Sequence, residues 1–432
     1  MQRPWYGCAK IAPEDAKRVN PTSIRASAHA RGAAIESPQA WLRLVVCLAI
    51  GAVGGVGMWS FIVSLPAVQA DFGVIRADAS LPYTCLMIGF ALGGVVTGQL
   101  ADRFGVMVPL LIGSLALSIG YLATAFAGSL LQVALLHGAL IGFGTSATFG
   151  PLVADISHWF TRRRGIAVAI CACGGYVAGV IWPPVVRILV DTVGWRHTHL
   201  GIGIICAVTL LPLTLAMRRR APVDAHGAPG LPVSGTPGNL GLSAGALQLL
   251  LSIAGVACCV AMAMPQVHIV AYCGDLGYGV ARGAEMLSLM LGFGIVSRIT
   301  SGLIADRIGG IRTLLLGSAL QGVALLLYLF FDGLFSLYVI SALFGLFQGG
   351  IVPSYAIIIR EYYSPREAGT RLGVVLMATL FGMALGGWMS GAIFDLTGSY
   401  RSAFANGLAW NLLNVSIAVW LLVRSRARMA YV

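Results

Sequence analysis

Long apolar runs separated by short polar segments form the dominant pattern of this chain. A run of about 20 apolar residues, rising about 1.5 Å per residue as a helix, crosses the roughly 30 Å hydrocarbon core of a bilayer. The pattern therefore predicts twelve membrane-spanning helices. They lie near 41–68, 80–101, 107–127, 130–156, 164–190, 199–217, 244–272, 283–305, 311–331, 334–360, 370–394 and 401–423.

The composition agrees with a protein that is dissolved in lipid. Of the 432 residues, 58% are hydrophobic and only 10% are charged, and the mean hydropathy is +0.85. A soluble protein is usually about a quarter charged. The nine cysteines form no metal-binding spacing, and neither a phosphate-binding loop with lysine nor a nucleophile signature is found. We therefore expect no catalytic residue, no metal and no cofactor, and we expect that the protein is not an enzyme.

The formal charge of +12 is placed in the N-terminal tail and in short segments beside the apolar runs. This placement excludes a nucleic-acid-binding domain and follows the rule that loops rich in Lys and Arg stay in the cytoplasm. With a cytoplasmic N-terminus, four arginines fall in outer loops and two within spans, which leaves 22 of the 28 Lys and Arg on the cytoplasmic side. An even number of spans then returns the C-terminus to the cytoplasm.

A segment rich in Pro and Gly, residues 221–241, has the composition of a flexible linker and divides the twelve spans into two sets of six. The first 40 residues are polar and lack the apolar centre of a signal peptide. The predicted organisation is a cytoplasmic tail (1–40), an N-terminal six-helix bundle (41–217), a cytoplasmic linker (218–243), a C-terminal six-helix bundle (244–423) and a cytoplasmic tail (424–432).

The two halves are related in sequence. The segment GQLADRFG at 98–105 returns as GLIADRIG at 302–309, and DTVGWR at 191–196 returns as DLTGSYR at 395–401. Asp155 at the end of the fourth span has its counterpart in Glu361 at the end of the tenth. Three matches, all 204 to 206 residues apart, indicate an internal duplication. We therefore predict an all-α integral membrane protein with twelve transmembrane helices in two pseudo-symmetric bundles.

The G-x-x-x-D-R-x-G loop in both halves resembles the signature of the major facilitator superfamily, and the resemblance covers about residues 41–423. It implies a carrier whose halves rock about a central site. The predicted motif and gating residues are Gly98, Asp102, Arg103, Gly105, Asp155, Arg162, Gly302, Asp306, Arg307, Gly309 and Glu361.

Each loop residue has an expected physical role. Gly98 and Gly302 permit close approach of helices. Asp102 and Asp306 can accept hydrogen bonds from a neighbouring helix end. The arginines that follow, Arg103 and Arg307, can pair with acids such as Asp155 and Glu361. Asp155 and Arg162 also resemble the acid–arginine pair that latches the inner face in this family. The chain departs from the full motif, because Val106 and Met107 replace its usual basic residues.

A narrower resemblance begins at the fifth span. RRGIAVAICACGG, then Pro183-Pro184 and Gly194-Trp195-Arg196, are similar to the monocarboxylate carriers and their oxalate/formate relatives. FGIVSR at 293–298 is similar to the segment that holds the substrate arginine of that branch, which falls here on Arg298. A sister branch that carries another anion is the alternative.

Arg298 lies about halfway along the eighth span with apolar or small residues on either side. A cation there costs about 2.5–3.5 kcal/mol on insertion scales. No acid occupies a mid-span position in either half, so an anionic ligand is the natural counter-ion, and a guanidinium matches a carboxylate with paired donors. The alternative is a structural arginine that is satisfied by backbone carbonyls.

Dicarboxylate carriers of the resembled branch use a second basic residue in the eleventh span, and this span has none, which favours a monocarboxylate. Animal-type carriers place an aspartate one turn before the arginine, where this chain has Gly294, and a lysine in the first span, which lacks one. His137 and His268 are then the candidates for proton transfer, with a structural hydrogen-bonding role as the alternative. The remaining candidates for the lining of the site are Gln348, Tyr272 and Trp59.

We therefore expect a secondary active transporter for a small monocarboxylate such as lactate or pyruvate, with proton coupling left open. Its partners are the anionic substrate, H+ in the coupled case and the lipid bilayer, and the transport unit is a monomer in a bacterial inner membrane. A carrier or exporter of another solute is the nearest alternative, and a membrane sensor for a carboxylate is a remote one.

Overall fold

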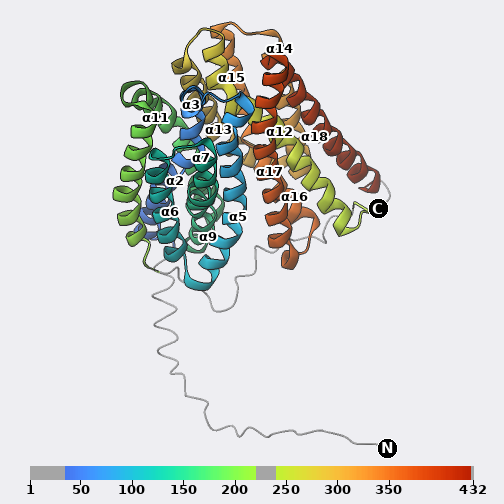
Figure 1. Cartoon of the computed structure of the whole chain (residues 1–432). Coiled ribbons are helices and arrows are strands. Elements are labelled where there is room, and N and C mark those ends of the chain that lie inside the picture. The colour runs from blue at the N-terminus through green and yellow to red at the C-terminus, as the bar shows by residue number, and fades with distance from the viewer. Residues whose placement is uncertain (1–34, 220–239, 430–432) are drawn as a thin grey trace, which may run out of the picture.

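The computed structural model describes residues 35–219 and 240–429, and these residues are mostly helical. They form two bundles that stand side by side, drawn from blue to green and from yellow to red in Figure 1. The N-terminal bundle contains α2 (Pro38–Gly54), α3 (Val56–Phe72), α4 (Arg76–Ala79), α5 (Leu81–Phe104), α6 (Met107–Ala125), α7 (Leu130–Leu136), the π-helix η1 (His137–Gly142), α8 (Phe143–Ala147), α9 (Gly150–Trp159), α10 (Arg164–Ala172) and α11 (Gly174–Ala216).

The C-terminal bundle is built from fewer and longer helices. It contains α12 (Ala244–Asp275), α13 (Val280–Ile308), α14 (Gly310–Phe330), α15 (Leu334–Gln348), α16 (Ile351–Tyr362), α17 (Pro365–Thr397) and α18 (Tyr400–Met429).

Eleven helical segments of the described chain are long and apolar enough to cross a membrane. One of them, residues 164–216, contains two spans, because Gly194 has non-helical backbone angles (φ 78°, ψ 163°) inside α11. A positive φ is readily adopted only by glycine. Dividing α11 at Gly194 gives the fifth and sixth spans and restores the predicted twelve.

The helices extend several residues beyond most of the predicted boundaries. The segment predicted as a C-terminal tail from residue 424 begins instead as a continuation of α18, which is helical through Met429. Most of the predicted N-terminal tail (residues 1–34) and of the predicted linker (residues 220–239) lies outside the described residues.

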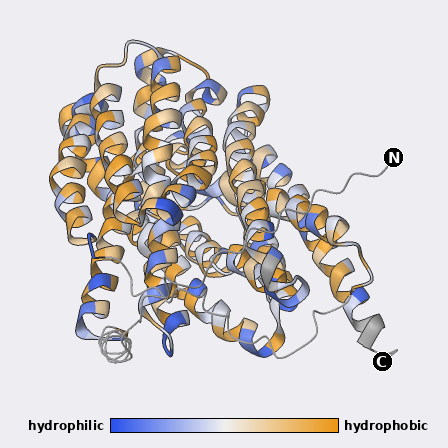
Figure 2. Ribbon diagram, turned by 90° about the horizontal axis from the view of Figure 1, so that it is seen from below, coloured by the Kyte–Doolittle hydropathy of each residue, from blue (hydrophilic) through white to orange (hydrophobic). Residues whose placement is uncertain are grey.

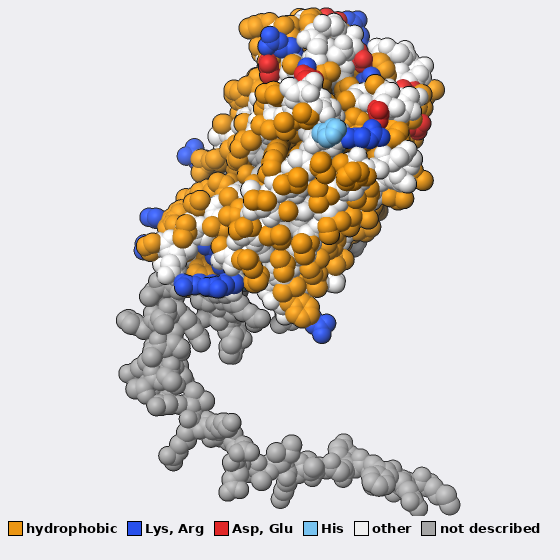
Figure 3. All heavy atoms as spheres, turned by 60° about the vertical axis from the view of Figure 1, so that its left-hand side comes forward, with side chains coloured by type: hydrophobic (Ala, Val, Ile, Leu, Met, Phe, Trp, Pro, Cys, Tyr) orange, Lys and Arg blue, Asp and Glu red, His pale blue; other side chains and the backbone are white. Residues whose placement is uncertain are grey.

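The surface of the bundles is apolar along the length of the helices. Large hydrophobic side chains point outward from both bundles, with exposed fractions of 65% at Leu42, 79% at Phe126 and 68% at Phe330. Figure 2 shows hydrophobic residues along the helices of both bundles, and the face in Figure 3 is mostly hydrophobic through its middle, with charged side chains toward the two ends. Such a belt suits contact with lipid tails.

The duplication is repeated in the backbone. Gly105 ends α5 with φ 84° and ψ 168°, and Gly309 ends α13 with φ 83° and ψ 166°. These angles are open to glycine and strained for other residues, so both copies of the motif need a glycine at this position. We call the end of the molecule that carries these two turns the DR-loop end.

The opposite end, here the Arg76 end, joins the two bundles. The guanidinium of Arg76 binds the carboxylate of Asp275 at 3.2 Å and the hydroxyl of Tyr400. Asp395 accepts hydrogen bonds from the backbone N–H groups of Arg76 at 2.9 Å and Ala77 at 2.7 Å. Arg76 comes from the N-terminal bundle and the three partners Asp275, Asp395 and Tyr400 from the C-terminal bundle. This end is therefore closed.

Candidate functional site

Arg298 lies on α13 at mid-depth, where the two bundles face each other. Its Nη1 donates to the carbonyl oxygen of Ala172 in the other bundle at 3.0 Å, and its guanidinium carbon lies 4.9 Å from the centre of the Tyr176 ring. The Nε atom is buried without a partner, and none of the ion pairs among the described residues includes Arg298. The guanidinium is half-buried and its charge is not neutralised by a protein carboxylate.

A break in the fifth span supplies the carbonyl that Arg298 binds. In a continuous helix the Ala172 oxygen would accept the N–H of Tyr176, but the N–H groups of Tyr176 and Val177 both bind the Cys173 oxygen, at 3.0 and 2.9 Å. The Ala172 carbonyl is therefore left free for a side chain. The break falls at the CGG sequence of the resembled motif, so this local sequence positions the arginine.

Gly294 explains how the Tyr176 ring reaches Arg298. A Cβ atom at Gly294 would lie only 2.4 Å from a ring carbon of Tyr176. An aspartate at this position, as the animal-type carriers have, would displace the ring. Here the arginine is covered by an aromatic face in place of an acid, and a cation over such a face gains about 0.5–2 kcal/mol.

Trp59 lies close to this arrangement, on the face of α3 that looks toward the C-terminal bundle. Its Nε1 donates to the Gly175 oxygen at 2.8 Å, three residues along the chain from the carbonyl that binds Arg298. A Cβ atom at Gly179 would lie 2.1 Å from Leu291 and 3.1 Å from the Trp59 ring. The small residues of α11 thus allow Trp59 and α13 to approach each other closely.

The other predicted lining residues of the C-terminal bundle each contact a different residue of that bundle. The side chain of Gln266, which the sequence analysis did not single out, donates to Gln348 at 2.9 Å. His268 binds the Gly387 oxygen through Nε2 at 2.8 Å, and the Tyr272 ring packs against Tyr400. Gln348 Nε2 and His268 Nδ1 are buried and unpaired. These residues tie α12 to α15 and α17, and their role toward substrate stays a prediction.

His137 lies inside the N-terminal bundle. Its Nδ1 is 2.8 Å from the Val133 oxygen, and its ring packs edge-on against Phe61 with a centroid distance of 4.9 Å. The side chain is fully buried. Among the described residues it makes no direct contact with Arg298, and it lies beside His199.

The predicted pairing of Asp155 with Arg162 is wrong for this conformation. Asp155 accepts two hydrogen bonds from Arg43 of the first span, from Nε at 2.7 Å and from Nη2 at 3.0 Å. Both side chains are buried, and the guanidinium lies 4.7 Å from the centre of the Trp159 ring. Arg162 is exposed on the turn that follows α9. The tertiary packing brings residue 43 closer to Asp155 than an arginine seven positions away.

The expected pairing of Glu361 with an arginine is also wrong. Glu361 accepts the N–H of Gly310 at 2.9 Å and so caps the first turn of α14. A carboxylate is stabilised there by the positive end of the helix. Arg103 packs over Phe104 at 5.2 Å, and Arg307 is exposed, so neither binds Asp155 or Glu361.

The remaining motif residues at the DR-loop end are open in this conformation. A Cβ atom at Gly98 or at Gly302 would meet no atom within 4 Å, and Asp102 and Asp306 are exposed. The close helix approach and the helix-end hydrogen bonds predicted for these four residues are therefore not made here. Among the described residues, the hydrogen bonds of Arg76 and Asp395 join the bundles at the opposite end, which explains why these four residues lie apart here.

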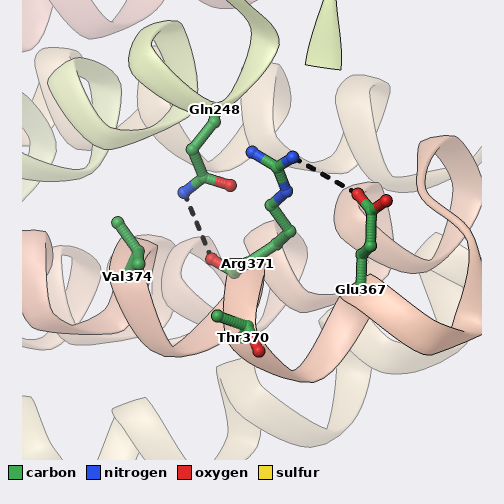
Figure 4. A pocket seen from close by; sticks show the side chains of 5 residues that line it. All are labelled: Gln248, Glu367, Thr370, Arg371 and Val374. Carbon is green, nitrogen blue, oxygen red and sulfur yellow. Dashed lines mark hydrogen bonds and ion pairs between the residues drawn. The ribbon is translucent and has the colours of Figure 1, made fainter. Parts of the chain in front are cut away.

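Two further features lie away from Arg298. Arg187 is paired with Asp191 one turn later on α11, which agrees with its placement near a helix end. A pocket of about 330 Å³ near the start of α12 and α17 is lined by Gln248, Glu367, Thr370, Arg371 and Val374. In it Gln248 donates to the Arg371 oxygen at 3.2 Å and Arg371 pairs with Glu367 at 3.3 Å (Figure 4). This pocket lies within one bundle and at its end.

Two helical bundles related by duplication, which meet around a mid-depth arginine, define a multi-pass carrier fold. The family model described as the Major Facilitator Superfamily matches residues 47–332 and again 249–431. The chain belongs to this superfamily.

Curated relatives place the chain with the monocarboxylate branch of that family. It is 29% identical to monocarboxylate transporter 13 of Bos taurus over 77% of this chain and 78% of the relative. It is 29% identical to human monocarboxylate transporter 11 over 81% and 80%, and 25% identical to the MFS-type transporter pynF of Aspergillus niger over 70% and 69%.

Solved structures share the fold at low sequence identity. A bacterial homologue of the lysosomal transporter Spinster, solved in an inward-facing and occupied conformation, is 15% identical with a TM-score of 0.63, over 90% of this chain and 96% of that one. A point mutant of the nucleoside transporter NupG is 18% identical with a TM-score of 0.64, over 90% and 98%.

Proposed function

We propose that this transporter carries a small monocarboxylate, of the lactate or pyruvate kind, and that Arg298 binds the carboxylate. The observation that carries the proposal is the half-buried guanidinium between the two bundles, which has one backbone carbonyl and one aromatic ring as neighbours and no protein acid among the described residues. A carboxylate would supply both the missing charge and acceptors for the unpaired N–H groups. The names of the relatives support the same substrate class.

The position of Arg298 suits a carrier site. It belongs to α13 and contacts Ala172 and Tyr176 of the other bundle, so a ligand on its guanidinium would bridge the two bundles. Binding energy at such a point can favour one arrangement of the bundles over another. The anion would neutralise the cation and lower the cost of enclosing it in a medium of low dielectric constant.

The contacts between the bundles favour an inward-open state. The Arg76 end is closed by the ion pair with Asp275 and by the two hydrogen bonds to Asp395. The DR-loop end leaves Gly98 and Gly302 without neighbours. The number of Lys and Arg residues on this side supports a cytoplasmic location for the DR-loop end and for both termini. Transport would require the Arg76 contacts to break while the DR-loop end closes.

The cellular setting stays a prediction. We retain a plasma membrane with cytoplasmic termini and a monomeric transport unit, and a bacterial inner membrane as the predicted home. The curated relatives named above come from mammals and a fungus. The proton as a second partner is also part of the proposal.

The test is counterflow of labelled short-chain acids in proteoliposomes. Wild-type protein should exchange labelled lactate or pyruvate against an internal excess of the same acid. Arg298→Gln should lower this rate at least about 100-fold, because a charge-assisted contact to a buried group is worth about 3 kcal/mol. Thermal unfolding in detergent should stay within a few degrees of the wild type.

Arg312→Gln is the matched control, since Arg312 is an exposed arginine of the same bundle. It should leave counterflow unchanged. Full exchange by the Arg298 variant would refute the binding role. Broad efflux of apolar compounds without exchange of any carboxylate would favour an exporter, and saturable binding without exchange would favour a sensor.

A further inference from the structure

Two imidazoles lie side by side in the interior of the N-terminal bundle, away from Arg298. His137 begins the π-helix η1, and His199 lies on α11 after the Gly194 turn. The ring centroids are 5.9 Å apart, and neither side chain has any exposed surface. The Nδ1 atoms lie 2.8 Å from the oxygens of Val133 and Trp195, respectively.

These carbonyls decide the tautomers. A carbonyl oxygen only accepts, so each neutral ring carries its proton on Nδ1, and each Nε2 is left as an acceptor. In the described part of the chain no group donates to the Nε2 of His137 or of His199, and both atoms are buried. A buried acceptor without a donor costs about 1–3 kcal/mol. The bundle therefore holds two unsatisfied acceptors of the same kind next to each other.

The C-terminal bundle shows that the fold does not require histidines at these two positions. At the offset of 204 to 205 residues His137 corresponds to Ser341 and His199 to Phe404. There Tyr328 stacks on Phe404, with centroids 4.8 Å apart, and hydrogen-bonds Ser341 at 2.8 Å. In the N-terminal bundle Tyr121, which lies 207 residues before Tyr328, stacks on His199 at 5.5 Å with the ring planes tilted by 21°. The same aromatic arrangement is thus built once with its polar groups satisfied and once with two orphaned imidazole nitrogens.

The π-helix that begins at His137 is a second, independent indication of a functional site. The π-turn starts at His137, and π-bulges inside helices cluster at functional sites. Ser341, the corresponding residue of the tenth span, lies in the regular helix α15. The π-helix and the two imidazoles therefore occur together in the N-terminal bundle. Both are missing at the corresponding positions of the C-terminal bundle.

We propose that the His137–His199 pair is the proton-binding site of this transporter, which holds one proton shared between the two Nε2 atoms. The proposal rests on the proposed function. The proton bonds to one Nε2 and forms an imidazolium, and the other Nε2 accepts a hydrogen bond from it, directly or through a water. A second proton is excluded because two like charges at this separation in a low dielectric repel each other strongly. One proton and one anion together make the cycle electroneutral.

The groups that pack against the two rings are aromatic. Tyr121 of α6 packs against both rings, Phe61 of α3 packs against His137, and Trp195 packs against His199. Ser60 hydrogen-bonds the Tyr121 hydroxyl, and Cys206 of α11 lies near Tyr121. Arg196, which is paired with Asp71, lies over the Trp195 ring that packs against His199. Imidazole is the side chain that changes charge near neutral pH, whereas phenols and thiols titrate higher.

Contiguous contacts lead from the pair to the substrate arginine. Tyr121 hydrogen-bonds Ser60 at 2.6 Å, and the next residue back is Trp59, which binds the Gly175 oxygen beside the α10–α11 break. Ala172, at the same break, holds Arg298. A movement of α3 on protonation would therefore be transmitted to the α10–α11 break and to Arg298.

The experiment separates coupling from translocation. Wild type and the double variant His137→Ser/His199→Phe, which copies the C-terminal bundle, are compared in proteoliposomes. One assay is lactate counterflow without a pH gradient, and the other is lactate-induced uptake of protons, followed with an external pH dye. The double variant should keep counterflow within about threefold and lose at least tenfold of the proton uptake per lactate. His137→Gln alone should lose it in part, and Ser341→Ala should change neither assay.

Three results of these assays would contradict the proposed proton site. Proton uptake per lactate at the wild-type level in the double variant would overturn the proposal and leave the pair as a structural feature with a buried water. Equal loss of both activities in the double and single variants, with unchanged unfolding temperature, would also overturn it, as would a wild type that exchanges lactate without proton uptake. Absence of counterflow in the wild type would instead refute the monocarboxylate proposal.

Discussion

The two bundles share one fold but use it differently. In the N-terminal bundle the first, fourth and fifth spans are interrupted near Gly55, between His137 and Phe149, and at Cys173, whereas the C-terminal bundle is interrupted in the tenth span, at Gly349-Gly350. The N-terminal bundle also holds the buried Arg43–Asp155 ion pair and the buried His137–His199 pair. The C-terminal bundle contributes the central arginine, and its counterpart in the first bundle at the same offset is Gly94.

This difference indicates a division of labour within a duplicated chain. The C-terminal bundle, in which the described spans are interrupted only in the tenth, can serve as the more regular support for the arginine proposed to bind the anion. The N-terminal bundle, with three interrupted spans, has more local irregularity, which in native proteins clusters at functional sites. The duplication supplied the frame, and later substitutions in each half supplied different chemistry.

The buried ion pair gives the largest expected difference between the bundles. Arg43→Leu copies Leu247 of the other bundle and should destabilise the protein by about 3–5 kcal/mol, because Asp155 is then a buried charge without a partner. Adding Asp155→Leu should restore most of the loss. Thermal unfolding in detergent is the measurement. An equal loss in the single and double variants would show that packing of Arg43, and not its charge, is what matters.

The corresponding acid of the C-terminal bundle should matter less. Glu361→Gln removes a charge that caps α14 but keeps an acceptor for the Gly310 N–H, so we expect a loss of about 0.5–1 kcal/mol in the same assay. A loss as large as that of Arg43→Leu would break the proposed asymmetry between the two acids.

The contacts of Arg76 that join the two bundles can be tested by substitution. Arg76→Gln should remove the contact with Asp275, which is worth about 1 kcal/mol because the acid is partly exposed, and so shift the opening equilibrium about fivefold. Spin labels at Ala70 on α3 and Leu396 on α17 should then show a larger share of long distances. An unchanged distance distribution would mean that the backbone contacts to Asp395 hold this end alone.

The smallest effect on stability is expected at the open end. Gly98→Ala and Gly302→Ala place a methyl group where no atom lies within 4 Å, so unfolding should change by less than about 0.5 kcal/mol. Counterflow should nevertheless slow severalfold if closure brings these helices together, as the motif predicts. At the tightly packed Gly345, whose Cβ would lie 1.9 Å from the Met290 oxygen, the same substitution should destabilise the protein by about 1–3 kcal/mol.

Sequence reasoning reached the membrane fold, the twelve spans and the duplication because each depends on local properties of the chain. Apolar length decides whether a segment can span a bilayer, and a motif such as G-x-x-x-D-R-x-G can be recognised wherever it occurs. Arg298 could be found in the same way, since a lone cation inside an apolar run is visible in one dimension.

The hydrogen-bond and ion-pair partners of individual side chains could not be predicted, because they depend on which helices become neighbours. Asp155 binds Arg43, 112 residues away, in place of the nearby Arg162. His199 was not a sequence candidate, although a search for intramembrane histidines in every span, including the short sixth one, would have found it. His137 was a candidate for proton transfer, but that His199 is its neighbour could not be inferred from the sequence.

The sequence alone therefore determined that this chain crosses a membrane in two related bundles, because lipid solvation and repetition act through the order of residues. Only the tertiary structure decided that the Tyr176 ring and a freed carbonyl cover Arg298, and that two histidines from different spans lie together. These arrangements come from close packing between helices far apart in the chain, where a few missing side-chain atoms, as at Gly294, decide which group fits.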